Sequence, residues 1–163
     1  MYFELTDHFE VAATIERTWG FFSSPANLPL ITPPWLKFKL ADSNPPTIER
    51  DSVLDYTISW LEMPVRWRTR IIDWSPPRQF IDLQIKGPYT LWHHQHTFTP
   101  SDRGVICADR VIYCPPMAWI GGAVHALVVR KQLLEIFRFR RKVIGEELGG
   151  MRALQEDVEV QRL

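Results

Sequence analysis

The sequence lacks several features that would assign it to a class at once. Its 19 basic and 19 acidic residues leave no net charge at pH 7, so no overall field attracts nucleic acid or an anionic membrane. No stretch approaches the roughly 18 uncharged apolar residues of a membrane span, and the N-terminus has no signal-peptide pattern. We therefore expect no nucleic-acid partner and no stable membrane insertion.

Cysteine is also scarce. Cys107 and Cys114 are the only two, and they lie seven residues apart in a predicted strand and its exit, too extended for a disulfide bond. We interpret both as free thiols, which fits a cytoplasmic protein. The chain has no P-loop, dinucleotide fingerprint, nucleophile elbow or paired-cysteine zinc motif. The sequence therefore predicts no cofactor.

What is present indicates one α+β domain. The 163 residues suit a single domain over 1–150, with a charged tail over 151–163 that we expect to extend the last helix weakly or fray. Apolar residues at odd spacing predict a first strand over about 2–11. Thr14 is the expected N-cap of a short helix, and a second helical turn is expected over 26–31.

Thirteen prolines, with four Pro-Pro pairs, and other turn residues divide the middle of the chain into strands. Short connections between neighbouring strands predict an antiparallel meander. The six strands expected are 35–40, 53–60, 65–74, 79–86, 91–99 and 105–113. One long helical pattern follows and ends at 149–150. Its apolar side comprises Ile120, Val124, Leu127, Val128, Leu134, Phe137, Ile144 and Leu148.

This order of elements, together with several motifs, resembles a known superfamily. The motifs are WRTRI at 67–71, WSPP at 74–77, FIDLQ at 80–84, GPY at 87–89, WHHQHTF at 92–98, and DRVIY at 109–113 followed by Pro115. They are similar to a bacterial ligand-binding branch, of unassigned function, of the SRPBCC superfamily. That superfamily also holds START lipid-transfer domains, birch-pollen allergens and polyketide cyclase/dehydrase proteins. The resemblance covers about 2–148.

The resemblance implies a helix-grip fold. In that fold a curved antiparallel sheet of about seven strands wraps a long C-terminal helix, with two short helices after the first strand. One helix and a strongly bent sheet cannot fill the space between them, so an internal cavity is expected. A fold does not by itself specify a function.

The strand over 91–99 carries the candidate chemistry. Alternation places four side chains on one face, which we take as the inner face: Trp92, His94, His96 and Phe98. If the next strand pairs with it, Asp109 and Tyr113 also face inward, and Asp109 can lie near His94 or His96. A carboxylate beside an imidazole orients the imidazole for proton transfer. A register slip of one residue would instead turn Arg110 inward.

Three interpretations of these histidines stay open. They can be half-buried strand residues satisfied by their neighbours, or polar lining that hydrogen-bonds a ligand. They can also ligate a metal ion together with a carboxylate, but two histidines without a third clear ligand are a weak signal, and no metal is predicted.

Asp82 and Gln84 can face either way. Alternation alone buries the aliphatic face of their strand and leaves Asp82 and Gln84 in water. The resemblance implies the opposite, because the same Phe-x-Asp-x-Gln pattern occurs in the branch. In that case the polar pair meets the ligand, and a partner subunit, as in a homodimer, covers the aliphatic face. An inward Asp82 then needs His94 or Arg70 as its partner.

Neighbouring strands and the long helix supply the remaining expected wall of the cavity. These residues are Tyr56, Ile58, Trp60, Trp67, Thr69, Ile71, Leu127, Leu134 and Phe137. Arg70 joins them only if its strand bulges or flips. The basic run over 138–142 is interpreted as a solvated face that offsets the helix dipole, with an anionic ligand head or membrane surface as the alternative.

The sequence therefore predicts a protein that binds a small, mostly hydrophobic ligand, such as a lipid, isoprenoid, quinone or polyketide-like molecule. One alternative is a cyclase or dehydratase. It would use His94 or His96 as general base, oriented by Asp109, with Tyr113 or Arg70 polarising a carbonyl. A third possibility is a protein-interaction or regulatory module.

Overall fold

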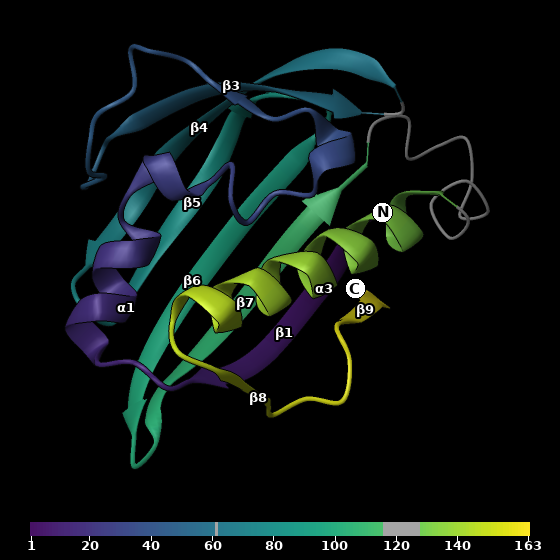
Figure 1. Ribbon diagram of the computed structural model, residues 1–163. Helices are drawn as coiled ribbons and strands as arrows, with labels where there is room; N and C mark the ends of the chain where they lie inside the picture. The colour runs from purple at the N-terminus through teal and green to yellow at the C-terminus, as the bar shows by residue number, and fades with distance from the viewer. Residues whose placement is uncertain (61, 116–127) are drawn as a thin grey trace.

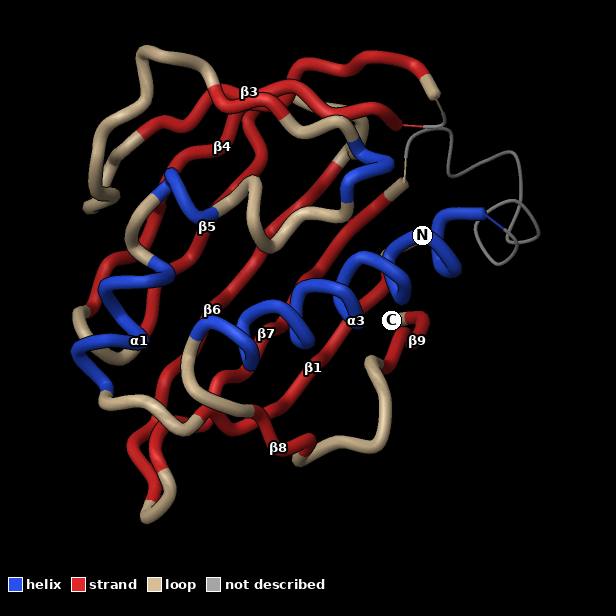
Figure 2. The backbone as a smooth tube through the Cα atoms, viewed as in Figure 1, coloured by secondary structure: helices blue, strands red, loops and turns tan. Residues whose placement is uncertain are grey.

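A computed structural model describes residues 1–60, 62–115 and 128–163, with the side chain of Trp60 left out. In the described part, nine strands form one antiparallel sheet in the order β2-β3-β4-β5-β6-β7-β1-β8, and β9 also pairs with β1. The sheet curves around the long helix α3. The short helix α1 lies beside the C-terminal end of α3 (Figures 1 and 2). The predicted helix-grip architecture is confirmed.

The strands follow the turn residues of the sequence. Their bounds are Phe3–Val11 for β1, Lys39–Leu40 for β2, Val53–Trp60 for β3, Met63–Ser75 for β4, Gln79–Lys86 for β5, Leu91–Ser101 for β6, Gly104–Cys114 for β7, Met151–Ala153 for β8 and Glu159–Arg162 for β9. Gly104 begins β7 with φ +148, and a Cβ there would lie 2.0 Å from the carbonyl oxygen of Val11. Only glycine fits this turn.

The helices also follow local signals. α1 covers Ile15–Phe22, and its N-cap Thr14 accepts a 3.3 Å hydrogen bond from the backbone of Arg17. Two 3-10 turns follow, at Pro25–Asn27 and Pro34–Leu36. α3 covers Arg130–Glu147. The expected helical positions Ile120, Val124 and Leu127, and the glycine pair at 121–122, lie outside the described residues.

Two expectations about local structure were wrong. The segment over 35–40 is a strand only at its end, because Pro34 has no N–H for a ladder and its fixed φ starts a helical turn. The tail over 151–163 neither extends the helix nor frays. It forms β8 and β9 on the free edge of β1, where its main chain supplies the missing hydrogen bonds.

The core lies between the inner face of the sheet and α3. Leu133 and Phe137 of α3 pack in one apolar cluster, and Ile144 and Leu148 in another. Burying each such side chain contributes about 1.5–3 kcal/mol.

Cys107 and Cys114 are both free and buried. Within the described ranges, no helix has the length and apolar character that spanning a bilayer requires.

Candidate functional site

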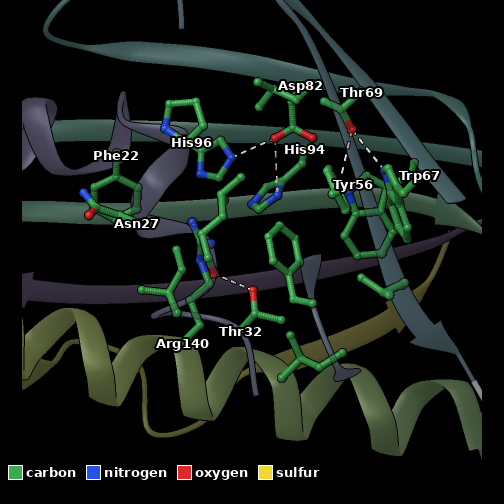
Figure 3. Close-up of a pocket in the computed structure, with 18 of the residues that line it drawn as sticks. Phe22, Asn27, Thr32, Tyr56, Trp67, Thr69, Asp82, His94, His96 and Arg140 are labelled. Carbon is green, nitrogen blue, oxygen red and sulfur yellow. Dashed lines mark hydrogen bonds and ion pairs between the residues drawn. The ribbon is translucent and has the colours of Figure 1, made fainter. Parts of the chain in front are cut away.

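A cavity of about 180 Å³ lies between the sheet and α3 (Figure 3). Strands β3 to β6 form its floor, α3 forms one side, and the segment from α1 to Ile48 closes the rest. Most of the lining is apolar or aromatic: Phe21, Phe22, Leu28, Ile31, Leu36, Phe38, Ile48, Leu54, Tyr56, Ile58, Trp67, Ile71, Phe80, Tyr89, Trp92, Leu133, Ile136 and Phe137. Such a surface favours a ligand with an apolar body.

A buried cluster of two histidines and two carboxylates interrupts this lining. The antiparallel register sets His94 opposite Asp82 and His96 opposite Asp109. His96 Nε2 hydrogen-bonds Asp82 Oδ2 at 2.9 Å, and His94 Nε2 hydrogen-bonds Asp109 Oδ1 at 2.8 Å. The two rings pack with centroids 3.7 Å apart. All four side chains are buried or nearly so, and Figure 3 shows the Asp82 carboxylate facing both rings.

The second nitrogen of each histidine also meets a carboxylate. His94 Nδ1 lies 3.6 Å from Asp82 Oδ2. His96 Nδ1 lies 2.8 Å from Asp109 Oδ1, but off the direction that a hydrogen bond requires. Each histidine is therefore held between Asp82 on one side and Asp109 on the other.

Arg140 of α3 reaches the same cluster. Its side chain is 12% exposed, its Nε lies 3.7 Å from Asp109 Oδ2, and its guanidinium sits 5.5 Å from the centre of the Phe22 ring. The guanidinium and two ionised carboxylates carry a net charge of −1. One imidazolium would neutralise the cluster, which is what a buried site favours.

The acid–base properties agree with one charged histidine. Burial disfavours charge on His96, but Asp109 and Asp82 outweigh it and raise the pKa of His96. Burial and the neighbouring His96 lower the pKa of His94. Burial would raise the pKa values of both carboxyl groups. Arg140 and the histidines hold the pKa of Asp109 well below its ordinary value, while His96 and His94 lower that of Asp82.

Ten of the residues expected at the cavity line it: Tyr56, Ile58, Trp67, Thr69, Ile71, Asp82, Trp92, His94, His96 and Phe137. Asp82 therefore faces inward, which decides between the two orientations left open by the sequence. On the opposite face of β5, Ile81 and Leu83 are half-buried and Ile85 is exposed.

Other expected residues lie elsewhere. Asp109 is buried behind the histidines rather than in the lining, and Tyr113 and Leu134 are also buried outside it. Gln84 donates a 2.6 Å hydrogen bond to the carbonyl of Tyr89 and does not line the cavity. The side chain of Trp60 and all of Leu127 lie outside the described part.

The placement of Arg70 at the cavity was wrong. Its side chain is 50% exposed and pairs with Asp51 at 2.6 Å on the outer face of the sheet. The register of β4 does shift on either side of it, but Thr69 and Ile71 stay buried, so the residue between them points outward.

Sequence reasoning missed three groups of lining residues, of which one comprises Leu54, Phe80 and Tyr89 on or beside the strands of the floor. The second group comes from α3 and comprises Gln132, Leu133, Ile136 and Arg140. The interpretation of 138–142 as a solvated face is wrong for Arg140, which follows Leu133 and Phe137 by seven and three residues, the spacing of one helix face. The alternative, that the basic run meets a ligand, agrees with this position. The third group comes from α1 and the segment after it, and includes Ser24, Pro25, Asn27 and Thr32. No periodicity marks an irregular segment, so no signal for this group was available.

Comparisons with known proteins agree with this geometry. The sequence model of the family described as "Polyketide cyclase / dehydrase and lipid transport" matches residues 11–137. No curated protein matches the chain.

Several solved structures share the fold. Protein CV1439 from Chromobacterium violaceum has a TM-score of 0.69 and 12% identity, over 89% of this chain and 96% of its own. The di-domain ARO/CYC StfQ of the steffimycin biosynthetic pathway has a TM-score of 0.67 and 14% identity, over 91% of this chain and 51% of its own. Norcoclaurine synthase from Thalictrum flavum, in complex with dopamine and hydroxybenzaldehyde, has a TM-score of 0.63 and 17% identity, over 90% of this chain and 86% of its own.

Proposed function

Because the chain belongs to the polyketide cyclase/dehydrase and lipid transport family, we propose that its cavity binds one small, mostly hydrophobic molecule that carries a polar oxygen. The apolar lining would hold the body of this ligand, and Arg140 with the histidine cluster would meet its oxygen. Quinone-like and polyketide-like rings fit this description, as does a short isoprenoid or lipid chain.

The volume of the cavity favours a compact ligand. A cavity of roughly 150 Å³ accommodates one benzene molecule. At about 180 Å³, this cavity suits one or two rings or a short chain better than a lipid with two long chains. Norcoclaurine synthase, which has the same fold, was solved with two small molecules, dopamine and hydroxybenzaldehyde.

The observation that carries the proposal is a pair of buried polar atoms in the lining. Arg140 Nε and Gln132 Oε1 have no hydrogen-bond partner among the described residues, and both side chains line the cavity. An unsatisfied buried polar group costs about 1–3 kcal/mol. Gln132 and Arg140 lie eight residues apart on α3, about 12 Å along its axis, so different oxygens of a ligand would meet them. A hydroxyl can donate to Gln132, and a carbonyl or hydroxyl oxygen can accept from Arg140.

A cavity-filling variant tests binding. Ile136 lines the cavity, so the indole of Ile136→Trp should occupy the ligand's space and weaken binding at least tenfold. Ile85→Trp is the matched control, because Ile85 is 51% exposed on the outer face of the sheet. Titration calorimetry with hydroxynaphthoquinones, flavonoid-type polyketides and short isoprenoid alcohols measures the change. Wild-type protein that binds none of them, or equal binding by both variants, would contradict the proposal.

A second candidate, catalysis of a cyclisation or dehydration, is favoured by the hydrogen bond between His96 and Asp82 on the cavity wall. This pair is placed to exchange a proton with a bound carbonyl compound. His96→Asn would then abolish turnover of a polyketide-like substrate while the ligand still binds. If the wild type binds the same compounds without converting any of them, the binding function alone stands.

A further inference from the structure

His94 and His96 both lie between the same two carboxylate oxygens, Asp82 Oδ2 and Asp109 Oδ1. Each presents one nitrogen to Asp82 Oδ2, with His94 Nδ1 at 3.6 Å and His96 Nε2 at 2.9 Å. Each presents its opposite nitrogen to the same atom, Asp109 Oδ1, at 2.8 Å. His94 Nδ1 and His96 Nε2 therefore face Asp82, which lines the cavity. The other two ring nitrogens face Asp109, which does not line the cavity.

We propose that Asp82, His94 and His96 bind a divalent transition-metal ion, such as Zn²⁺ or Fe²⁺, with an open coordination position toward the cavity. Two imidazoles and one carboxylate are a common donor set for both ions. The three ligand atoms lie within 4.8 Å of one another. The donors of a tetrahedral site with bonds of about 2.1 Å are roughly 3.4 Å apart. The two ligand distances to Asp82, 2.9 and 3.6 Å, bracket that value.

Asp109 has the position of an outer-shell residue. A histidine that ligates a metal usually directs its other ring nitrogen to a carboxylate, which fixes the ring and its tautomer. Asp109 takes this place for His94, whose Nε2 it meets in a 2.8 Å hydrogen bond. It also lies 2.8 Å from His96 Nδ1, where a small rotation of the ring would complete a second hydrogen bond. Asp109 is 3% exposed, and its second oxygen faces Arg140.

The charge of the site agrees with a metal ion and an oxygen ligand. A metal ion would displace the proton that His96 carries without it, because a ligating imidazole is neutral. Asp82, Asp109 and Arg140 then sum to −1, and a divalent ion brings the sum to +1. An anionic oxygen in the open position, from hydroxide or from an enolate or phenolate ligand, restores neutrality in this buried place. The cavity is where such an oxygen would enter, so the metal would sit beside the polar group of the bound molecule.

Metal titration of the untagged protein tests the site. After dialysis against a chelator, the wild type should bind one Zn²⁺ or Co²⁺ per chain, and Co²⁺ should give the visible absorption bands of a four- or five-coordinate site. Asp82→Asn, His94→Ala and His96→Ala should each weaken binding by more than about 100-fold. Asp109→Asn should weaken it by about 10–100-fold, as outer-shell changes do.

His93→Ala is the matched control, because His93 is adjacent on β6 but faces the opposite side of the sheet and does not line the cavity. It should leave metal affinity unchanged. Circular dichroism and thermal unfolding check that each variant is folded. Wild-type protein that binds neither Zn²⁺, Co²⁺ nor anaerobic Fe²⁺ at 1:1 stoichiometry overturns the proposal, whatever the variants do. So does a folded Asp82→Asn variant with wild-type affinity.

The same samples separate this inference from ligand binding. Chelator-treated wild type that still binds the lipophilic compounds but no metal keeps the proposed function and rejects the metal site. One-to-one metal binding without affinity for any of the lipophilic compounds supports the metal site and rejects the proposed ligand-binding function.

Discussion

Replacing Asp7 with asparagine should make the protein more stable at neutral pH, although it removes a buried ion pair. Asp7 is 1% exposed on β1, directly opposite Asp109 of β7. Arg141 donates a 3.0 Å hydrogen bond to Oδ1, but Oδ2 has no partner among the described residues. Burial, and then the charge of Asp109, raise the pKa of Asp7 to about 6, against the opposing effect of Arg141, His8 and Arg140.

The sign and size of the effect follow from this pKa. The folded state holds the Asp7 proton up to about pH 6, whereas the unfolded state releases it near 3.8. The stabilisation from Asp7 is therefore complete below pH 3.8 and is lost as the pH rises through 6. The difference of about two pKa units corresponds to roughly 3 kcal/mol. Asparagine does not ionise and avoids this loss. Because Arg141 also loses its charged partner, 3 kcal/mol is an upper limit.

Urea unfolding of Asp7→Asn and wild type at pH 4 and 7.5 measures the difference. We expect the variant to gain stability relative to wild type as the pH rises, and to exceed it at pH 7.5. Glu10→Gln on the same strand is the control, because the expected change in stability is opposite. Ser101 and Arg152 lower the pKa of Glu10, so its ionised form stabilises the folded state, and Glu10→Gln should lose stability at neutral pH. A destabilisation by Asp7→Asn that is the same at both pH values would refute the reasoning.

Two further predictions concern the helix and the tail. Arg140→Met removes the guanidinium that faces Asp109 and should lower the free energy of unfolding by about 1–3 kcal/mol, whereas Lys142→Met, at a side chain 74% exposed, should change it by less than about 0.5 kcal/mol; urea unfolding compares them. Truncation after Gly150 removes β8, β9 and the buried Val158, so the urea midpoint should fall; a midpoint equal to that of the full chain would show that the tail is not structural.

Most strands were predictable because their signals are local. The alternating pattern and flanking turn residues placed β3 and β5 at the bounds that the structure has. The same alternation put His94, His96 and Asp109 on the inner faces of β6 and β7, and the short connection brought those strands together. The tail failed this reasoning because β8 and β9 are held by main-chain pairing with β1, which leaves little trace in the pattern of side chains.

The cluster required more than alternation. Alternation alone pointed to the wrong face of β5, because it buries the aliphatic side chains and leaves Asp82 in water, whereas the family resemblance implied an inward Asp82. The structure pairs β5 with β6, sets Asp82 opposite His94 and places it in the cavity lining. Arg140 belongs to the basic run over 138–142, whose residues the helix places on different faces. Arg138 pairs with Asp157 at the surface, whereas Arg140 faces the cavity.

The sequence by itself determined the α+β class, most of the strands, and the inward face of the two histidines, since each of these depends on periods of two or 3.6 residues along the chain; the helix-grip fold was implied by the family resemblance. Only the tertiary structure decided that Asp82, Asp109 and Arg140 meet those histidines around one cavity. That meeting depends on strand register, sheet curvature and the rotation of α3, and these are fixed by the packing of segments far apart in the sequence.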